Sequence, residues 1–515
     1  MARCQPTAAQ RRTDSSKMNA PGSSIAYAFA RDKGVMVLEG REPLTLAVRE
    51  GADPFALLEV RRILGQPFQV VPFSAEDFAR QLPATYARAE LDDEDEAAAL
   101  AGHDDLATLA EGLHQTSDLL DGDDDAPVIR LINGLIYEAI NRGASDIHIE
   151  PNEDELTIRY RIDGVLQKIL SPSRRLSTPL VSRIKVMARL DIAERRVPQD
   201  GRIALSVGGR SVDLRVSTLP SRYGERVVLR LLDKAQALMS LESLGMPSAT
   251  LQRFKAMLNE PNGVILVSGP VGSGKTTTLY SGLSLLNDGT KSIITIEDPI
   301  EYGLDGIGQT QVNDKVGMTF ASGLRAFLRQ DANIVMVGEI RDVETASVAA
   351  RMSLAGRLVL STIHTNSAAA AVTRLKDMGV ESYLLASTLR GVLAQRLVRV
   401  LCKACREPYT PSASDLQAAG LEPGTDVKFY KAVGCDACSK TGYTGRIGIY
   451  ELMTVTPELR DLIHDDADEA AIAGAAFAEY DMLFEAGMAR VLSGETSLEE
   501  VIRVSRKEGA GHADV

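Results

Sequence analysis

The sequence lacks an uninterrupted apolar run near the ~18 residues that a membrane-spanning helix requires. Its opening stretch, MARCQPTAAQRRTDSSKM, has basic residues but no apolar segment of the kind that secretory signals contain. We therefore expect a flexible tail over residues 1–23, or a true start at Met18. Positive charge is also in deficit, because 57 Lys and Arg face 70 Asp and Glu, which gives a net charge of −13. That balance disfavours a chain that coats nucleic acid. Because the sequence has neither a candidate membrane span nor a signal segment, we expect a cytoplasmic protein.

Cysteine is equally scarce, with five residues, of which four form two C-x-x-C pairs. The pairs consist of Cys402, Cys405, Cys435 and Cys438. Two such pairs predict a four-thiolate, tetrahedral Zn²⁺ site of the structural type, in a reducing compartment. Redox-active or free thiols are the alternative. Few aromatic or basic residues interleave with the cysteines, which disfavours a zinc ribbon that binds nucleic acid.

What the sequence does contain is a phosphate-binding motif. The segment GVILVSGPVGSGKTTTLY (263–280) is typical of a buried strand over 264–268, a glycine-rich turn, and a helix from Lys275. It matches G-x-x-x-x-G-K-[ST], in which Lys275 binds the β- and γ-phosphates and Thr276 binds Mg²⁺. The residues predicted to contact ATP are Gly269, Pro270, Val271, Gly272, Ser273, Gly274, Lys275, Thr276 and Thr277.

Three further apolar strands end in polar side chains, and they alternate with helices between about 241 and 400, as in a P-loop α/β core. SIITIEDPIEY ends in carboxylates that include Glu297 and Glu301, NIVMVGEIRD contains Glu339, and LVLSTIHTN contains a histidine, His364. Ligands of open α/β sheets bind beyond the carboxyl ends of the strands, so we expect these side chains beside the phosphate loop.

The strand that contains Glu339 departs from the ordinary Walker B pattern. Gly338 occupies the place of the aspartate that normally holds Mg²⁺, and Glu339 follows it. We interpret Glu339 as the general base that holds the attacking water. Mg²⁺ would then depend on Thr276 and on carboxylates between Glu297 and Glu301.

With 515 residues, of which 44% are hydrophobic, the chain should form about three domains. Short strands and helices predict an α+β unit over 24–85, for which we favour partner docking over a purely structural role. An acidic linker over 86–125 follows. A second α+β domain spans 126–235, and the P-loop domain spans 236–515, with the zinc-binding subdomain at 400–440. A capping box, Ser-Leu-Glu-Glu, is expected to open the final helix.

The second α+β domain is rich in arginine. Its strands carry or adjoin Arg202, Arg215, Arg226 and Arg230. Solvated charge on the polar face of an antiparallel sheet is one interpretation. Contact with a phosphate group is the other, because a planar guanidinium with five donors suits that role. The positions in the sequence leave both open.

Several motifs together resemble one family. GPVGSGKTTTLY, ITIEDPIEY, VMVGEIRD, LVLSTIHTN, GVLAQRLVR and TGYTGRIGIYE are similar to the secretion ATPases of type II secretion and type IV pilus assembly. The resemblance covers about 126–505, and the opening SSIAYAFARDKGVMVL resembles the N-terminal domain of the type II (GspE) branch. The pilus retraction motors are shorter and lack this domain and the cysteine tetrad. Type IV pilus extension is the alternative within the family, and a nucleic-acid translocase is a rival from another class.

The resemblance implies a RecA-like ATPase core, preceded by a PAS-like α+β domain and a small N-terminal α+β domain, with a Cys4 zinc-binding insertion. It implies a Mg²⁺-dependent ATP hydrolase that forms a homo-hexameric ring in the cytoplasm and drives pseudopilus assembly and protein export. The implied partners are inner-membrane platform proteins, namely a GspL-like cytoplasmic domain and a GspF-like protein, which would hold the ring at the inner membrane. No nucleic-acid partner is implied.

The resemblance also implies roles for single residues. Glu339 matches the catalytic glutamate of the family, Glu297 and Glu301 fall in its Asp box, and His364 falls in its His box. The four cysteines match its zinc-binding insertion.

Arginines of the family are matched as well. Arg215 and Arg230 match residues of the second domain that reach the γ-phosphate and couple nucleotide state to domain movement. Other arginines of the active region match Arg325, Arg329, Arg341 and Arg374. One departure is the sequence Ala-Gly-Arg at 355–357, where the family usually has Thr-Gly-His. The site is expected to survive this change, and the departure bears on the ring-interface contacts nearby.

Overall fold

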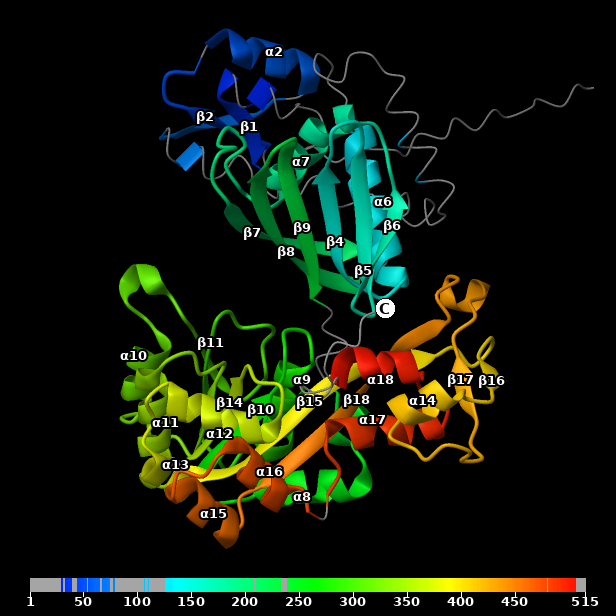
Figure 1. The fold of residues 1–515 in the computed structure, drawn as a ribbon. Coiled ribbons are helices and arrows are strands. Elements are labelled where there is room, and N and C mark those ends of the chain that lie inside the picture. The colour runs from blue at the N-terminus through cyan, green and yellow to red at the C-terminus, as the bar shows by residue number, and fades with distance from the viewer. Residues whose placement is uncertain are drawn as a thin grey trace, which may run out of the picture. The chain divides into compact units, whose positions relative to one another are not determined.

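The computed structural model describes residues 29–30, 33–38, 44–52, 54–64, 67–74, 77–78, 106, 110, 126–207, 210–232, 239–478 and 480–505. The chain divides into two compact units, Met1–Leu232 and Asp233–Val515. The tail at 1–23 and most of the acidic linker at 86–125 lie outside the described residues. Within the described helices, none is long and apolar enough to cross a bilayer. The predicted α/β class, with α+β structure ahead of a P-loop type core, is confirmed (Figure 1).

The first unit begins with a small three-stranded sheet in the order β1-β2-β3. Its elements are β1 (Val35–Leu38), β2 (Thr45–Arg49), α2 (Pro54–Leu64) and β3 (Gln69–Phe73). Strand β2 pairs antiparallel with β1 and parallel with β3, so α2 is the crossover between the two parallel strands. Ala56 and Val60 lie four residues apart on α2 and are buried, whereas Phe55 and Leu58 on the same helix are 75% and 63% exposed.

A six-stranded antiparallel sheet follows in the order β6-β5-β4-β9-β8-β7. Its elements are α6 (Ala126–Asn141), β4 (Ala144–Pro151), β5 (Leu156–Ile162), β6 (Val165–Leu170), α7 (Ser177–Met187), β7 (Gln199–Val207), β8 (Arg210–Ser221) and β9 (Gly224–Leu232). The apolar i, i+3, i+4 stripe of α6 packs into one core with the apolar residues of the strands. In that core the hydroxyl of Tyr160 donates to the Leu135 carbonyl at 2.7 Å, which ties β5 to α6.

The strand register of this sheet places charged residues side by side. Arg202 on β7 lies opposite Arg215 on β8, which lies opposite Arg230 on β9, and Arg230 lies opposite Asp146 on β4. Side chains of directly paired residues share one face of a sheet. The three arginines therefore form a row across three strands.

The second unit is built on a seven-stranded sheet in the order β12-β11-β13-β14-β10-β15-β18. The strands are β10 (Gly263–Ser268), β11 (Ile293–Glu297), β12 (Gly308–Gln311), β13 (Ile334–Val337), β14 (Leu358–Ile363), β15 (Leu389–Leu401) and β18 (Tyr443–Thr454). All neighbours pair in parallel except β15 and β18. A parallel sheet is normally covered on both faces, as the two cores of this unit demonstrate.

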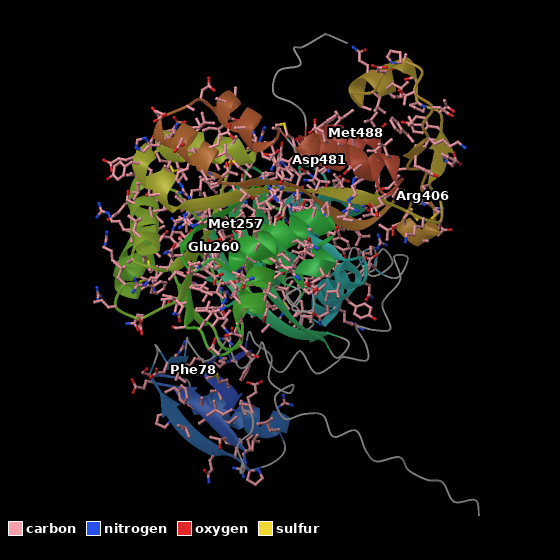
Figure 2. All side chains as sticks on the ribbon, turned by 90° about the horizontal axis from the view of Figure 1, so that it is seen from below. Phe78, Met257, Glu260, Arg406, Asp481 and Met488 are labelled. Carbon is pink, nitrogen blue, oxygen red and sulfur yellow. The ribbon has the colours of Figure 1, made fainter. Side chains whose placement is uncertain are left out.

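Alternate residues of β10 belong to different cores. Val264 and Leu266 face one core, whereas Ile265 and Val267 face the other. Figure 2 labels one residue of each core, namely Met257 and Met488. The helices of this unit are α8 (Ser248–Leu258), α9 (Lys275–Leu286), α10 (Phe320–Phe327), α11 (Val343–Leu354), α12 (Ala368–Asp377), α13 (Ser382–Thr388), α15 (Pro457–His464), α16 (Glu469–Ala476), α17 (Leu483–Leu492) and α18 (Leu498–Ser505). Residues of α8 and α9 pack on one face, and those of α11 and α12 pack on the other (Figure 1).

Side-chain caps begin two helices directly after the strands that carry predicted site residues. The Asp342 carboxylate accepts from the N–H of Thr345 at 2.7 Å, and this cap opens α11. The Ser367 hydroxyl accepts from the N–H of Ala370 at 3.0 Å and opens α12. These caps fix where the chain leaves β13 and β14, and so they fix the short segments that hold the polar residues of the site.

A small subdomain is inserted between β15 and β18. It contains β16 (Glu407–Tyr409), α14 (Ala413–Ala418) and β17 (Phe429–Lys431). Strands β16 and β17 pair antiparallel, and Phe429 is fully buried. The pairing of β15 with β18 runs from Gly391 to Leu401, so the insertion folds back on itself and returns the chain beside the strand that it left.

Candidate functional site

The turn between β10 and α9 has a backbone that glycine makes possible. Gly272 and Gly274 have φ values of 80° and 86°, in the left-handed region where Cβ atoms are disfavoured. A Cβ atom at Gly269 would lie 2.4 Å from the Ser273 Oγ and 2.6 Å from the Gln395 carbonyl oxygen. The turn therefore closes tightly and ends at the first residue of α9, where the N-terminus of a helix favours an anion.

Lys275 is buried at the centre of this turn, with only 8% of the residue exposed. Its Nζ donates to the carbonyls of Gly269 at 2.8 Å and Pro270 at 3.0 Å. Burial lowers the pKa of Lys275 to about 8, although the charge of Glu339 acts in the opposite direction. The buried Ser273 Oγ has no hydrogen-bond partner within the described part of the chain. A buried ammonium, an unpaired hydroxyl and a helix N-terminus are the donors that a polyphosphate requires, so these residues fit that ligand.

Two of the predicted strand ends meet at this lysine. The His364 Nδ1, after β14, lies 3.5 Å from Lys275 Nζ, and its Nε2 lies 3.2 Å from the Glu339 carboxylate, after β13. A neutral imidazole with its proton on Nε2 satisfies both contacts. Arg341 pairs with the other oxygen of Glu339 and lies 3.6 Å from Asp298. His364 and Arg341 thus fix the direction of the Glu339 carboxylate, and His364 links that carboxylate to Lys275.

The third strand end is arranged differently. Glu297 is only 3% exposed, and its carboxylate accepts from the hydroxyls of Tyr280 and Thr295 and, at 3.2 Å, from the Gln309 side chain. Burial, together with the charge of Glu297, raises the pKa of Tyr280. These contacts join β11 to α9 and β12, so Glu297 is held inside the domain. Glu301, four residues later, is half-buried.

The other predicted phosphate-loop residues lie where the motif requires them along the turn and the first turn of α9. Thr276 and Thr277 are half-buried, and Val271 is 82% exposed at the tip of the turn. Sequence reasoning missed Gln395, which contacts the turn from β15. Its signal was present, because Gln395 interrupts the apolar stretch GVLAQRLV in a strand that should be buried on both faces.

The predicted arginines fall into two groups. In the second unit, Arg325 pairs with Glu344, and Arg329 donates to the Arg325 carbonyl at 3.3 Å. Arg374 is exposed on α12. In the first unit, the Arg230 Nε donates to Asp146 at 3.0 Å. Arg215 is half-buried beside it in the row of arginines described above.

The four cysteines come together in the inserted subdomain. Their sulfur atoms all lie within 4.8 Å of one another, with separations of 3.9 Å for Cys402–Cys435, 3.8 Å for Cys405–Cys438 and 3.7 Å for Cys435–Cys438. A tetrahedron with Zn–S bonds of about 2.3 Å has edges of about 3.8 Å, so the cluster fits Zn²⁺. Backbone N–H groups of Gly434 and Gly442 donate to Cys405 and Cys438 at 3.3 and 3.1 Å.

The pKa of Cys438 reflects this setting. Burial raises it, but hydrogen bonds from the N–H groups of Cys435 and Gly442 outweigh burial and bring the pKa to about 6. Thiolates are the form that binds Zn²⁺. Burial raises the pKa of Cys405 to about 11, so the support for a structural metal site comes from the spacing of the four sulfur atoms and from the ionisation of Cys438.

We expect one Zn²⁺ per chain, lost in the variant Cys438→Ser. Because the cluster closes the end of the β15–β18 pair, a loss of about 3 kcal/mol would lower the melting temperature by roughly 6–12 °C. Metal analysis by mass spectrometry and thermal melts of the full chain measure both effects. Cys4→Ser, at the cysteine outside the tetrad, is the control. Equal metal content in all three proteins would contradict the zinc assignment.

A mostly parallel sheet with a glycine-rich phosphate loop, and with acidic and histidine side chains at neighbouring strand ends, defines the class of P-loop α/β nucleotide-binding proteins. Comparison with known families is more specific. The family model of type II/IV secretion system proteins matches residues 121–503, so the chain belongs to that family. A second model, for a domain of GSPII protein E, matches residues 24–86.

Curated relatives agree over nearly the full chain. Type II secretion system protein E of Aeromonas hydrophila is 51% identical over 495 residues, which cover 96% of this chain and 99% of that protein. Type II secretion system ATPase E of Vibrio cholerae is 52% identical over 491 residues, with 94% and 97% covered.

Solved structures agree at the level of the fold. The pilus retraction motor PilT with bound ADP has a TM-score of 0.50 at 27% identity, with 73% of this chain and 96% of that chain covered. The ATPase DotB of Legionella pneumophila has a TM-score of 0.54 at 20% identity, with 72% and 94% covered, and supports the fold alone.

Proposed function

We propose that this chain is a Mg²⁺-dependent ATP hydrolase that works as a homo-hexameric ring and drives pseudopilus assembly and protein export in type II secretion. The observation that supports this most is the chain of contacts from Lys275 through His364 to Glu339. It links a phosphate-binding ammonium to a carboxylate that can orient water, across the ends of neighbouring strands.

In this proposal, the turn at 269–274 and Lys275 bind the β- and γ-phosphates of ATP. Glu339 takes a proton from the attacking water, whose oxygen bonds to the γ-phosphorus while the bond from that phosphorus to the ADP oxygen breaks. His364 and Arg341 keep the Glu339 carboxylate aimed, which is the main requirement of a reaction that depends on positioning. Thr276 would hold Mg²⁺, which neutralises phosphate charge when bound.

The remaining site residues take supporting roles in the proposal. Glu297 acts indirectly, because its carboxylate is engaged by Tyr280 and its neighbours, and it steadies the segment that leads to Glu301. Arg215 and Arg230 would bring positive charge from the second domain to the γ-phosphate. Arg325, Arg329 and Arg374 are exposed or paired at the surface, which suits contacts between ring subunits.

The proposed partners follow from the domains ahead of the P-loop unit. We assign 24–85 to docking of a GspL-like cytoplasmic domain, 126–235 to a PAS-like α+β domain, and 400–440 to the zinc-binding subdomain. The match of 24–86 to a domain of GSPII protein E favours type II secretion over type IV pilus extension, and a GspF-like protein would complete the platform. The net charge of −13 supports a function without nucleic acid.

The test is ATPase activity of the full chain with Mg²⁺, with EDTA, and with Mg²⁺ plus a GspL-like cytoplasmic domain and acidic lipid vesicles. We expect activity only with Mg²⁺ and stimulation by the partner. Phe55 and Leu58 are exposed apolar residues on α2, so Phe55→Ser with Leu58→Ser should reduce the stimulation and spare basal activity. Tyr383→Ser, at another exposed aromatic residue, is the matched control. Stimulation by DNA or RNA in place of the partner would favour a translocase.

A further inference from the structure

Strand β15 carries a buried amide side chain beside the phosphate loop. Gln395 is 2% exposed, and its Nε2 donates to the Ser273 carbonyl at 2.6 Å. Its Oε1 accepts from the Thr278 hydroxyl at 2.7 Å. One side chain therefore holds both the last part of the turn and the first turns of α9.

The glycines of the motif also pack against this residue. A Cβ atom at Gly269 would lie 2.6 Å from the Gln395 carbonyl oxygen, and a Cβ atom at Gly274 would lie 2.7 Å from its Nε2. Such distances are too short for real Cβ atoms. The close approach of Gln395 thus sets part of the shape of the turn, from a strand that lies more than 100 residues away in the sequence.

The next residue of β15 holds the neighbouring strand end. Arg396 donates to the Asn366 carbonyl at 2.7 Å and to the Gln395 carbonyl at 3.1 Å. Asn366 follows His364 by two residues, and His364 contacts Lys275. Two adjacent residues of β15 therefore align the two segments that meet at the predicted γ-phosphate site.

We infer that Gln395 is a positioning residue for the phosphate loop, and that its amide keeps Ser273, Gly274 and Lys275 in the conformation that receives the phosphates of a nucleotide. The inference depends on the proposed function, in which this turn binds ATP. Gln395 does not touch the reacting atoms. Its loss should therefore weaken nucleotide binding and raise KM, with a smaller effect on kcat once the site is saturated.

The two contacts of the Gln395 side chain need one donor and one acceptor at fixed places, so substitutions at position 395 can test them. Methionine has nearly the same shape but neither group. An ionised glutamate has no donor for the Ser273 carbonyl, whereas a protonated glutamic acid has both a donor and an acceptor. Burial raises the pKa of a carboxyl group, so Gln395→Glu should regain nucleotide affinity as the pH is lowered.

The experiment measures binding of a fluorescent ADP analogue with Mg²⁺ to full-length variants that melt cooperatively. Loss of two hydrogen bonds in Gln395→Met should weaken binding by about tenfold or more. Thr278→Val should weaken it severalfold, and Thr278→Ser should restore it because the hydroxyl is kept. For Gln395→Glu, affinity relative to the parent protein should improve between pH 8 and pH 6.

The matched control is Thr496→Val. Thr496 is fully buried and its hydroxyl donates to the Arg399 carbonyl of β15 at 2.7 Å, four residues from Gln395. It should lower stability without changing nucleotide affinity. Parental affinity in Gln395→Met, or an equal loss of affinity in Thr496→Val, would overturn the inference. If Gln395→Met does not fold, equal affinity of Thr278→Val and Thr278→Ser overturns it. Parental nucleotide binding by Lys275→Ala would instead refute the proposed function itself.

Discussion

Lys275→Ala should abolish measurable ATP hydrolysis, with a fall of at least about 10²- to 10³-fold, while the chain stays folded. The ammonium is the only side-chain cation that the described turn itself supplies, and it donates to the carbonyls of Gly269 and Pro270 in that turn. Removing one preorganised group that stabilises developing charge typically has an effect of this size. Because burial disfavours the charged lysine, its removal should not destabilise the domain. Phosphate release and thermal melts measure the two properties.

A pH profile separates this role from simple packing. Burial lowers the pKa of Lys275 to about 8, and a bound polyphosphate would raise it by favouring the ammonium. Below about pH 8 the lysine is already protonated, so nucleotide binds without taking up a proton. Above that pH, binding requires proton uptake, and affinity should fall by up to about tenfold per pH unit. Lys275→Arg, which stays charged, should flatten the profile, and a flat profile in the parent chain between pH 7 and pH 9.5 would contradict the assignment.

The phosphate loop could be predicted from the sequence because its determinants are local. Glycines, lysine and threonine at fixed spacing define the turn, and the flanking apolar strand and helix supply its context. The meeting of His364 and Glu339 beside Lys275 follows from a topological rule, since parallel strands open their carboxyl ends at one edge. The metal site of the four cysteines could also be predicted, because the spacing of metal ligands is a local signal, as it is for the phosphate loop.

Contacts that depend on packing between distant elements could not be predicted. Glu297 lies at a strand end like Glu339, yet Tyr280 from α9 and Gln309 from β12 engage its carboxylate in the interior. No local pattern indicates which of two strand-end carboxylates will accept a hydrogen bond from a hydroxyl on a neighbouring helix. The polar side chain of Gln395 in an apolar strand was a signal in the sequence, but its contacts could not be predicted, because its two partners are more than 100 residues away along the chain.

The capping box predicted for the final helix is realised in one half only. The N–H of Glu500 donates to the Ser497 hydroxyl at 3.3 Å, as the motif requires. The Glu500 carboxylate, however, pairs with Arg399 from β15 and with Arg503. Two charge-assisted bonds are stronger than one bond to a neutral backbone N–H, so the ion pairs prevail. The carboxylate therefore ties α18 to β15, which the local sequence could not indicate.

Glu339→Gln should separate nucleotide binding from hydrolysis. The amide oxygen of glutamine can still accept from Arg341, so the segment after β13 should keep its structure. A neutral amide is a much weaker acceptor for the proton of the attacking water, and turnover should fall by about 10²- to 10⁴-fold. ADP affinity should stay close to that of the parent protein, and ATP should remain bound and unhydrolysed. Single-turnover hydrolysis, together with binding of the fluorescent nucleotide, measures both.

The comparison of Glu339→Gln with Lys275→Ala is more informative than either variant alone. If hydrolysis requires a phosphate-binding lysine and a separate water-orienting carboxylate, the lysine variant should lose affinity and the glutamate variant should lose only the chemical step. Glu495→Gln, at an arginine-paired glutamate near the end of α17, is the matched control and should hydrolyse ATP normally. Hydrolysis by Glu339→Gln at the parental rate would remove Glu339 from the reaction. The water would then have to be oriented by an acceptor other than Glu339.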